Sequence, residues 1–309
     1  MRTFEELKRA ATDRGARTVA VVGAASTTAL GALDAAVRSG LARAVLVGHA
    51  DRARELVRGK GFEALLDARF VDVPDDEAGL RAAALAGTGE VEILLKGTLR
   101  TDQLLRAVLD RRHGLRTERL LSDVLLYEDT LSGEARLVGV TDGGINVAPT
   151  LDQKRQIIEN AIAVFHALGY ERPRVALMSA TEAVTDSVPS TTEARALTEL
   201  AAARENPASL LARADIFGPL ALDNALLVSA ARAKNIASDV AGRADIMVLP
   251  NIEAGNILGK AVKYLAGSAT AHVVVGARVP VLIPSRVESA DDKLLSIALG
   301  VVAYDAVRQ

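Results

Sequence analysis

Short apolar runs that end at glycine alternate with longer helical segments along much of the chain, and this alternation limits the fold more than any other feature. The apolar runs of the first hundred residues lie at 18–22, 44–47, 70–73 and 93–95, with helical segments at 29–38 and 51–58. Strand, turn and helix in repeated order are typical of βαβ units, which stack into a parallel sheet. The runs are apolar on both faces, as burial under helices on both sides requires. The sequence therefore predicts an α/β fold whose mostly parallel sheets are flanked by helices.

The pattern changes from about Arg119 onward. Apolar runs at 120–127 and 136–140 flank Ser132-Gly133, a turn that favours an antiparallel hairpin. The elements that follow are a helix at 151–168, strands at 175–179, 246–249, 272–276 and 281–283, and a final helix at 291–302. A chain of 309 residues is long for one domain, and no Pro-, Gly- or Ser-rich linker divides it. We therefore expect two domains that share a sheet, with the active site in the cleft between them.

Composition excludes several classes of function. The chain has no cysteine, so disulfides, thiolate metal sites and cysteine nucleophiles are excluded, and an intracellular enzyme is favoured. A net charge of -2 gives no field that would attract nucleic acid or an anionic membrane. The charged segment 1–14 lacks the apolar centre of a signal peptide, and no run of about 18 uncharged apolar residues occurs. We expect a cytoplasmic protein.

Common catalytic motifs are also missing. The turn at 22–26 has neither the G-x-G-x-x-G spacing nor the lysine of a phosphate-binding loop, so we interpret it as a structural turn. The four histidines, His49, His113, His166 and His272, are too far apart in sequence for metal-ligand spacing. No G-x-S-x-G occurs, so the nucleophile elbow of α/β-hydrolases is absent.

The segment 96–106 is the first that a scaffold does not explain. Lys96-Gly97 ends a buried strand, and Arg100 and Arg106 follow in the next helical segment. A glycine turn, a helix amino terminus and basic side chains together favour an anion site. The sequence alone does not decide whether one of these arginines is functional, because exposed arginines on helices are common.

The second such segment is 283–293, between an apolar strand and the last helix. Ser289 looks like a helix N-cap, with Asp292 three residues later in a near capping box. That interpretation leaves Ser285-Arg286 without a structural purpose at the end of the strand. A hydroxyl, a guanidinium and a carboxylate this close in sequence suit phosphate chemistry.

At these segments the chain resembles the phosphate acetyl/butyryltransferase family, and the resemblance extends over nearly its whole length. The matching blocks are Lys96-Gly97, 105–109, 114–117, Thr141-Asp142, 218–223, 240–245, 249–256 and Ser285-Arg286. Length, the Lys96-Gly97 turn and block 114–117 favour the butyryltransferase branch. Glu288 also fits this branch, whereas Asp292 resembles the acetyltransferases, and Phe217 replaces an Asp that usually precedes the Gly-Pro pair.

The resemblance implies a homodimeric phosphate acyltransferase that exchanges coenzyme A for inorganic phosphate on a short-chain acyl group, butyryl in preference to acetyl. It implies a domain I of residues 1–117 and 277–309, a dimerising domain II of residues 118–276, and neither a metal nor a cofactor, coenzyme A being a substrate. Arg106 and Arg286 would hold phosphate, Ser285 would bind the coenzyme A sulfur, and Asp292 would take the thiol proton. Lys96, Thr98 and Asn256 would be further substrate-binding residues.

Two other functions fit parts of the pattern. Similar domains attached to malic enzymes bind acyl-CoA without turnover, so a non-catalytic regulatory module is the alternative. That alternative predicts loss of the catalytic set, whereas Ser285, Arg286 and Asp292 are all present. A metal-dependent decarboxylating dehydrogenase has a related architecture but needs clustered metal-binding aspartates, which the sequence does not display.

Overall fold

The computed structural model describes residues 1–131, 133–203, 206, 208–285 and 287–307. The chain splits into two compact units. We call Glu5–Arg119 with Ala271–Gln309 the terminal unit, and Leu120–Thr270 with Met1–Phe4 the central unit. Among the described residues, no helix is long and apolar enough to cross a membrane.

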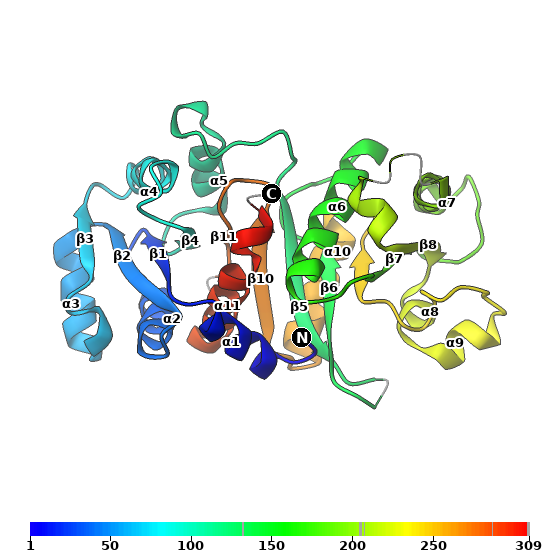
Figure 1. Ribbon diagram of the computed structural model, residues 1–309, viewed down its shortest axis with the longest axis horizontal. Coiled ribbons are helices and arrows are strands. Elements are labelled where there is room, and N and C mark those ends of the chain that lie inside the picture. Colours follow the sequence, from blue (N-terminus) through cyan, green and yellow to red (C-terminus); the bar gives the residue numbers. More distant parts are fainter. Residues whose placement is uncertain (132, 204–205, 207, 286, 308–309) are drawn as a thin grey trace. The chain divides into compact units, whose positions relative to one another are not determined.

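The terminal unit is built on a parallel sheet with the order β3-β2-β1-β4-β11, and β10 pairs antiparallel with β11 (Figure 1). Its strands are β1 (Arg17–Val22), β2 (Ala42–Gly48), β3 (Arg69–Asp72), β4 (Ile93–Lys96), β10 (Thr270–Val275) and β11 (Val281–Leu282). Its helices are α1 (Phe4–Asp13), α2 (Thr27–Arg38), α3 (Ala50–Lys60), α4 (Ala78–Gly87), α5 (Thr101–Leu109) and α11 (Ala290–Val307), with short 3₁₀ turns η1 (Glu63–Leu65) and η2 (Arg111–His113). The predicted parallel sheet flanked by helices is confirmed.

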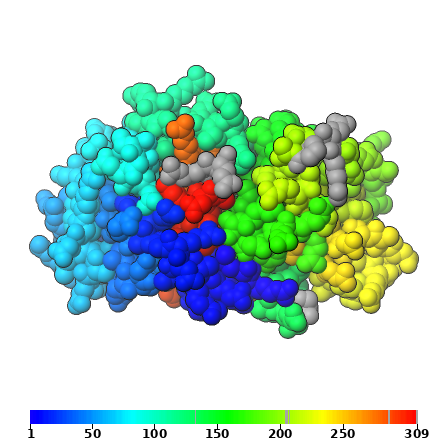
Figure 2. Space-filling view, viewed as in Figure 1, coloured from blue at the N-terminus to red at the C-terminus, as the bar shows by residue number. Residues whose placement is uncertain are grey.

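Two helices of the terminal unit show why their sequences adopt these positions. In α1, Leu7 and Ala11 are buried at a spacing of four residues, while its charged side chains face solvent; Figure 2 shows α1, in dark blue, at the surface. Helix α11 is buried on nearly every side from Leu295 to Tyr304, and it packs against α2, β4 and β11. A helix that is apolar all round belongs in a core, so the few charged residues of α11 need an explanation.

The central unit begins with the predicted hairpin. Its strands are β5 (Ser122–Asp129), β6 (Arg136–Thr141), β7 (Arg174–Met178), β8 (Asp215–Leu220) and β9 (Ile246–Val248). Strands β5 and β6 pair antiparallel, and β6-β9-β7-β8 then continue in parallel. Its helices are α6 (Leu151–Ala167), α7 (Pro189–Ala203), α8 (Leu222–Leu226), α9 (Val228–Ala233) and α10 (Ile252–Lys260), with a 3₁₀ turn η3 (Leu210–Arg213) and a π-helical turn η4 (Ala261–Leu265).

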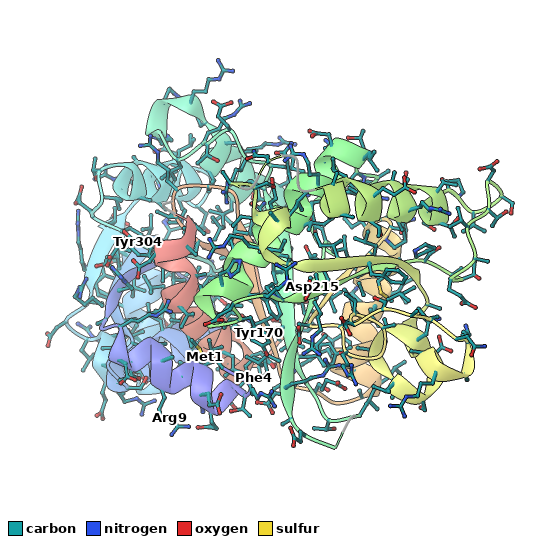
Figure 3. All side chains as sticks on the ribbon, turned by 45° about the vertical axis from the view of Figure 1, so that its right-hand side comes forward. Met1, Phe4, Arg9, Tyr170, Asp215 and Tyr304 are labelled. Carbon is teal, nitrogen blue, oxygen red and sulfur yellow. The ribbon has the colours of Figure 1, made fainter. Side chains whose placement is uncertain are left out.

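The first residues of the chain belong to the central unit. The amino group of Met1 donates to the carbonyl oxygen of Leu168 at 2.7 Å, and the Phe4 N–H donates to the Glu128 carboxylate. Figure 3 shows Met1, Phe4 and Tyr170 gathered in one region. These contacts hold the start of the chain against the end of α6 and against β5.

Strand β8 is the main element that the sequence did not predict. It contains Gly218-Pro219, and both residue types weaken a strand pattern. The strand lies at the edge of its sheet, where a proline without an N–H is tolerated. Helices α7 and α10 were also not predicted, whereas the strands of the terminal unit agree with the predicted runs to within two residues.

Candidate active site

Segments 96–106 and 283–293, which a scaffold does not explain, leave the terminal unit's sheet at the same edge. Strand β4 runs parallel to β11, with Leu94 opposite Val281 and Leu95 opposite Leu282. Lys96-Gly97-Thr98 therefore leaves the sheet at the same edge as Ser285, as the labels β4 and β11 in Figure 1 allow the reader to follow. The carboxyl edge of parallel strands is where α/β folds usually bind ligands.

Glycine is required directly after β4. The Gly97 N–H donates to the carbonyl oxygen of Val22 at 2.8 Å, and the Thr98 N–H donates to that of Gly23 at 2.9 Å. A Cβ atom on Gly97 would lie 2.1 Å from the Gly23 oxygen, so no larger residue fits without backbone movement. The Thr98 hydroxyl donates to the same oxygen at 3.2 Å, and its side chain is exposed. The turn after β1 thus helps to form this edge, a role that the sequence did not reveal.

Arg100 and Arg106, the two arginines of segment 96–106, both lie near the carboxylate of Asp102. The Nε atom of Arg100 lies 3.1 Å from Oδ1 of Asp102, and NH2 of Arg106 lies 3.6 Å from its Oδ2. Their side chains are 71% and 82% exposed, so neither is fixed by burial. Lys96, in contrast, is buried at the end of β4. Both guanidiniums are therefore exposed to solvent beside the same carboxylate.

Asp292 forms the capping box that the sequence suggested. Its N–H donates to the Ser289 hydroxyl oxygen at 3.1 Å, and its Oδ2 accepts from the Ser289 N–H at 3.2 Å and from the hydroxyl at 2.5 Å. Asp292 is buried, whereas Ser285 is exposed. The cap is confirmed, and the role of Asp292 as a base stays a prediction. Arg286 lies outside the described residues.

Lys293 and Glu288 are buried charged side chains beside the half-buried His272, a group that the sequence did not single out as a site. The ammonium of Lys293 donates to the carbonyl oxygens of Ser285 at 3.0 Å and Glu288 at 2.7 Å. Oε1 of Glu288 lies 3.6 Å from Nε2 of His272, while its Oε2 is buried with no hydrogen-bond partner among the described residues. Burial lowers the pKa of Lys293, partly offset by the charges of Glu288 and Asp292. The available signal was a lysine in the first turn of a helix whose following turns are nearly all apolar.

Asn256 lies in the central unit, in the first turns of α10. Its side chain is exposed, and Nδ2 donates to the carbonyl oxygen of Gly143 at 3.2 Å. The backbones of Gly143 and Gly255 approach closely, since a Cβ on Gly143 would lie 2.8 Å from the Gly255 carbonyl carbon. The N-cap of this helix is Asn251, whose side chain accepts from the Ala254 N–H.

A second buried acid lies beside that contact. Asp142 accepts hydrogen bonds from the N–H groups of Gly144, Ile145 and Asn146 at 2.8 to 3.2 Å. Burial, and then the charge of Asp123, raise the pKa of Asp142 to about 6. In the sequence this residue stood out only as part of a family block.

Comparisons with known proteins agree with the resemblance. A profile described as "Phosphate acetyl/butaryl transferase" matches residues 55–301. The phosphate acetyltransferase of Rhizobium meliloti is 39% identical over 283 residues, which cover 91% of this chain and 87% of that protein. The probable phosphate butyryltransferase of Bacillus subtilis is 37% identical over 290 residues, which cover 94% of each.

A solved structure extends the agreement to the fold. The crystal structure of a branched-chain phosphotransacylase from Enterococcus faecalis V583 matches with a TM-score of 0.80 and 28% identity, over 93% of this chain and 99% of that one. These three relatives are all named as enzymes, so the regulatory-module alternative gains no support. With a family profile over most of its length and relatives above 30% identity over nearly all of it, the chain is an acyltransferase and belongs to the phosphate acetyl/butaryl transferase family.

Proposed function

We propose that this acyltransferase moves a short-chain acyl group reversibly between coenzyme A and inorganic phosphate. The observation that carries the proposal is that Lys96-Gly97-Thr98 and Ser285 follow two paired parallel strands at the same carboxyl edge of the sheet. Both segments match blocks of the family, and a basic strand end beside a hydroxyl suits an acyl phosphate. Acyl-CoA and phosphate are the substrates, and neither a metal nor a further cofactor takes part.

In the proposed reaction a phosphate oxygen attacks the thioester carbonyl carbon and the carbon–sulfur bond breaks. The proton that the phosphate gives up ends on the leaving thiolate of coenzyme A. Arg286 and Arg106 hold the phosphate and offset the charge that develops on the carbonyl oxygen, an effect of about 3 kcal/mol for a good donor. Lys96, Thr98 and Asn256 complete the substrate contacts. These roles follow the family pattern, residue by residue.

In the reverse direction the thiol of coenzyme A is the nucleophile. A thiol has a pKa near 8.5, so only a few per cent of it is thiolate at neutral pH. Asp292 takes this proton and Ser285 donates a hydrogen bond to the sulfur. A positioned base is worth typically about 10² to 10⁴ in rate.

We also propose that butyryl is preferred to acetyl. The probable phosphate butyryltransferase of Bacillus subtilis aligns over 94% of both chains, and the structural relative at 28% identity is a branched-chain enzyme. A panel of acyl-CoA substrates from acetyl to hexanoyl, each with saturating phosphate, would measure the preference. A higher kcat/KM for acetyl-CoA than for butyryl-CoA would contradict it.

A homodimer formed through the central unit completes the proposal. The segment of α10 and η4 exposes Ile257, Tyr264 and Leu265, and Leu265 is 86% exposed. Exposed apolar side chains gathered on one segment are typical of an interface. A second copy of the chain would bury them. The cytoplasmic location expected from the sequence stays a prediction.

The reaction type is tested by following thiol release from butyryl-CoA with a thiol reagent. Dialysed, chelator-treated protein should release coenzyme A when phosphate or arsenate is present, and should not do so without them. Arsenate is the sharper probe because the acyl arsenate hydrolyses and draws the reaction forward. Thiol release at an equal rate without either anion would mean a thioesterase.

A further inference from the structure

Lys293 is one of the most deeply buried charged groups in the terminal unit. It lies in the first turn of α11, and only 2% of its surface is exposed. The rest of that helix is nearly all apolar, so nothing in the helix pattern requires a lysine here. Burying an ammonium is costly unless hydrogen bonds and opposite charges compensate.

The compensation comes from the backbone of the segment that carries Ser285. The Glu288 N–H donates to the carbonyl oxygen of Ser285 at 3.2 Å, which closes a turn. The Lys293 ammonium then donates to both ends of that turn, to the Ser285 oxygen at 3.0 Å and the Glu288 oxygen at 2.7 Å. Charge-assisted hydrogen bonds are roughly twice as strong as neutral ones. The Lys293 side chain therefore stabilises the backbone at both Ser285 and Glu288.

The charges around the ammonium are arranged to keep it in place. Glu288, only 6% exposed, and Asp292 both act to raise the pKa of Lys293, against the lowering by burial. On β10, His272 has its Nε2 atom 3.6 Å from Oε1 of the Glu288 carboxylate. Asp292 is itself held by Ser289, so the lysine is linked to the turn before α11 and to the cap of α11 at once.

We propose that Lys293 is a positioning residue, which fixes the Ser285–Glu288 turn against α11 so that the Ser285 hydroxyl is held ready for the reacting sulfur. This inference rests on the proposed acyl transfer to phosphate. Lys293 touches no substrate and acts only through the turn. A turn displaced by an ångström would cost roughly 10²-fold in rate, because the reacting groups would lose their alignment.

The first test compares two buried lysines. Lys293→Met keeps the apolar stem but removes the ammonium donor from both carbonyl oxygens, and the Ser285 oxygen then accepts only from the Glu288 N–H. Lys154→Met is the matched control, because Lys154 is also buried but lies in the central unit, paired with Glu193. Both variants should melt at a lower temperature than the wild type. At 25 °C, well below melting, kcat for phosphate-dependent thiol release should fall roughly 10²-fold for Lys293→Met and less than about 2-fold for Lys154→Met.

The absence of cysteine from the chain allows a second test that does not depend on the stability of Lys293→Met. The single thiol of Lys293→Cys can be alkylated in the unfolded chain with bromoethylamine, which restores an ammonium at nearly the length of lysine, and the protein then refolded. Alkylation with iodoacetamide gives a neutral control of similar size. The ammonium form should recover at least about a third of wild-type kcat, and the neutral form should not. Equal activity of the two forms would overturn the proposal.

The third measurement asks whether Lys293 acts through Ser285. In the Ser285→Ala background, the fold-loss in kcat caused by Lys293→Met should be less than about a third of the fold-loss in the wild type, since the hydroxyl to be positioned is gone. Independent, multiplying losses would contradict a positioning role, as would a Lys293→Met variant with normal kcat and a lowered melting temperature. Wild-type protein that shows no phosphate dependence would instead defeat the proposed function.

Discussion

At the scale of single residues, Asp292 has a structural role that is visible and a chemical role that is proposed. Asp292→Asn keeps the size of the side chain and an oxygen that can accept from Ser289. We expect a melting temperature near that of the wild type, with kcat for acyl-CoA synthesis lower by about 10² or more, because an amide cannot take the thiol proton. The loss should shrink as pH rises toward the thiol pKa, since thiolate then forms unaided.

Ser289→Ala is the matched control for Asp292→Asn. It removes the hydroxyl to which the Asp292 N–H donates, and should lower the free energy of unfolding by about 0.5 to 2 kcal/mol. The loss of kcat should be far smaller than in Asp292→Asn, because the carboxylate is still present. Thermal melting and steady-state kinetics on both variants separate the cap from the base. Normal turnover in Asp292→Asn would show that Asp292 only caps α11.

Arg106 and Arg100 form a second matched pair, since both contact Asp102 and both are exposed. Arg106→Ala should lower kcat/KM for phosphate by about 10² or more, because a guanidinium binds phosphate through two parallel hydrogen bonds. Arg106→Lys should recover only part of the loss. Arg100→Ala should change kcat/KM by less than about 2-fold. Phosphate saturation curves check this, and the opposite ranking would move the phosphate-binding role to Arg100.

Asp142 should make stability depend on pH in a recognisable way. Its pKa is raised to about 6, against about 3.9 in an unfolded chain, so the folded state holds this proton more tightly. The tighter binding of this proton therefore adds most to the free energy of unfolding below about pH 4, and the added stability is lost as pH rises through 6. Urea unfolding at pH 4.5 and 6.5 should show the wild type losing roughly 2 kcal/mol relative to Asp142→Asn.

Asp142→Asn also weakens hydrogen bonds, but their effect on the free energy of unfolding does not change with pH. The change between pH 4.5 and 6.5 in the difference between wild type and variant therefore measures the effect of the Asp142 proton alone. Equal pH dependence in wild type and variant would mean that Asp142 is ionised throughout this range.

At the scale of elements, the turn after β4 depends on a glycine. Gly97→Ala would place a methyl group against the Gly23 carbonyl oxygen, so the backbone must move. We expect a loss of about 1 to 3 kcal/mol in the free energy of unfolding. The loss in kcat/KM should be at least roughly 10-fold, because the displaced turn belongs to the site.

The control is Gly59→Ala in α3, where an added Cβ meets nothing within 4 Å. Alanine there should stabilise the helix by about 0.5 to 1 kcal/mol and leave kinetics unchanged. Chemical unfolding and kinetics on both variants are the measurement. Wild-type kcat/KM in a destabilised Gly97→Ala would separate this turn from catalysis.

The sequence predicted the elements that follow simple rules. Buried parallel strands such as β1 and β4 read as apolar runs, and their shared edge follows from the βαβ rhythm. Strand β8 was not predicted, because the Gly218-Pro219 pair disfavours a strand. The proline is tolerated there because β8 lies at the edge of the sheet.

The residues of the site could be predicted from the sequence only in part. Lys96 was found because it ends a strand, and Ser285 because it comes soon after one. The hydrogen bonds from Lys293 to the Ser285 and Glu288 carbonyl oxygens could not be predicted, because they depend on the direction of one side chain at the start of α11. Likewise, the contact of the Gly23 turn with Gly97 needs the pairing of β1 with β4.

At the scale of the whole molecule, the exposed apolar segment of α10 and η4 predicts self-association. Leu265→Lys places a charge on the proposed interface and should convert a dimer to a monomer at micromolar concentration. Leu66→Lys, at another exposed leucine in the terminal unit, is the control and should leave the dimer intact. Light scattering coupled to size-exclusion chromatography gives the mass. A wild-type monomer, or a Leu265→Lys dimer, would contradict this interface.

The central claim is that the acyl group passes from coenzyme A to phosphate, and phosphorus-31 NMR of the reaction mixture tests it most directly. With butyryl-CoA and inorganic phosphate, a new acyl phosphate resonance should grow in step with free thiol, one for one. The same mixture with Ser285→Ala should form both products more slowly but in the same ratio. Free thiol that accumulates while the inorganic phosphate signal stays constant and no acyl phosphate resonance appears would mean that water, and not phosphate, accepts the acyl group.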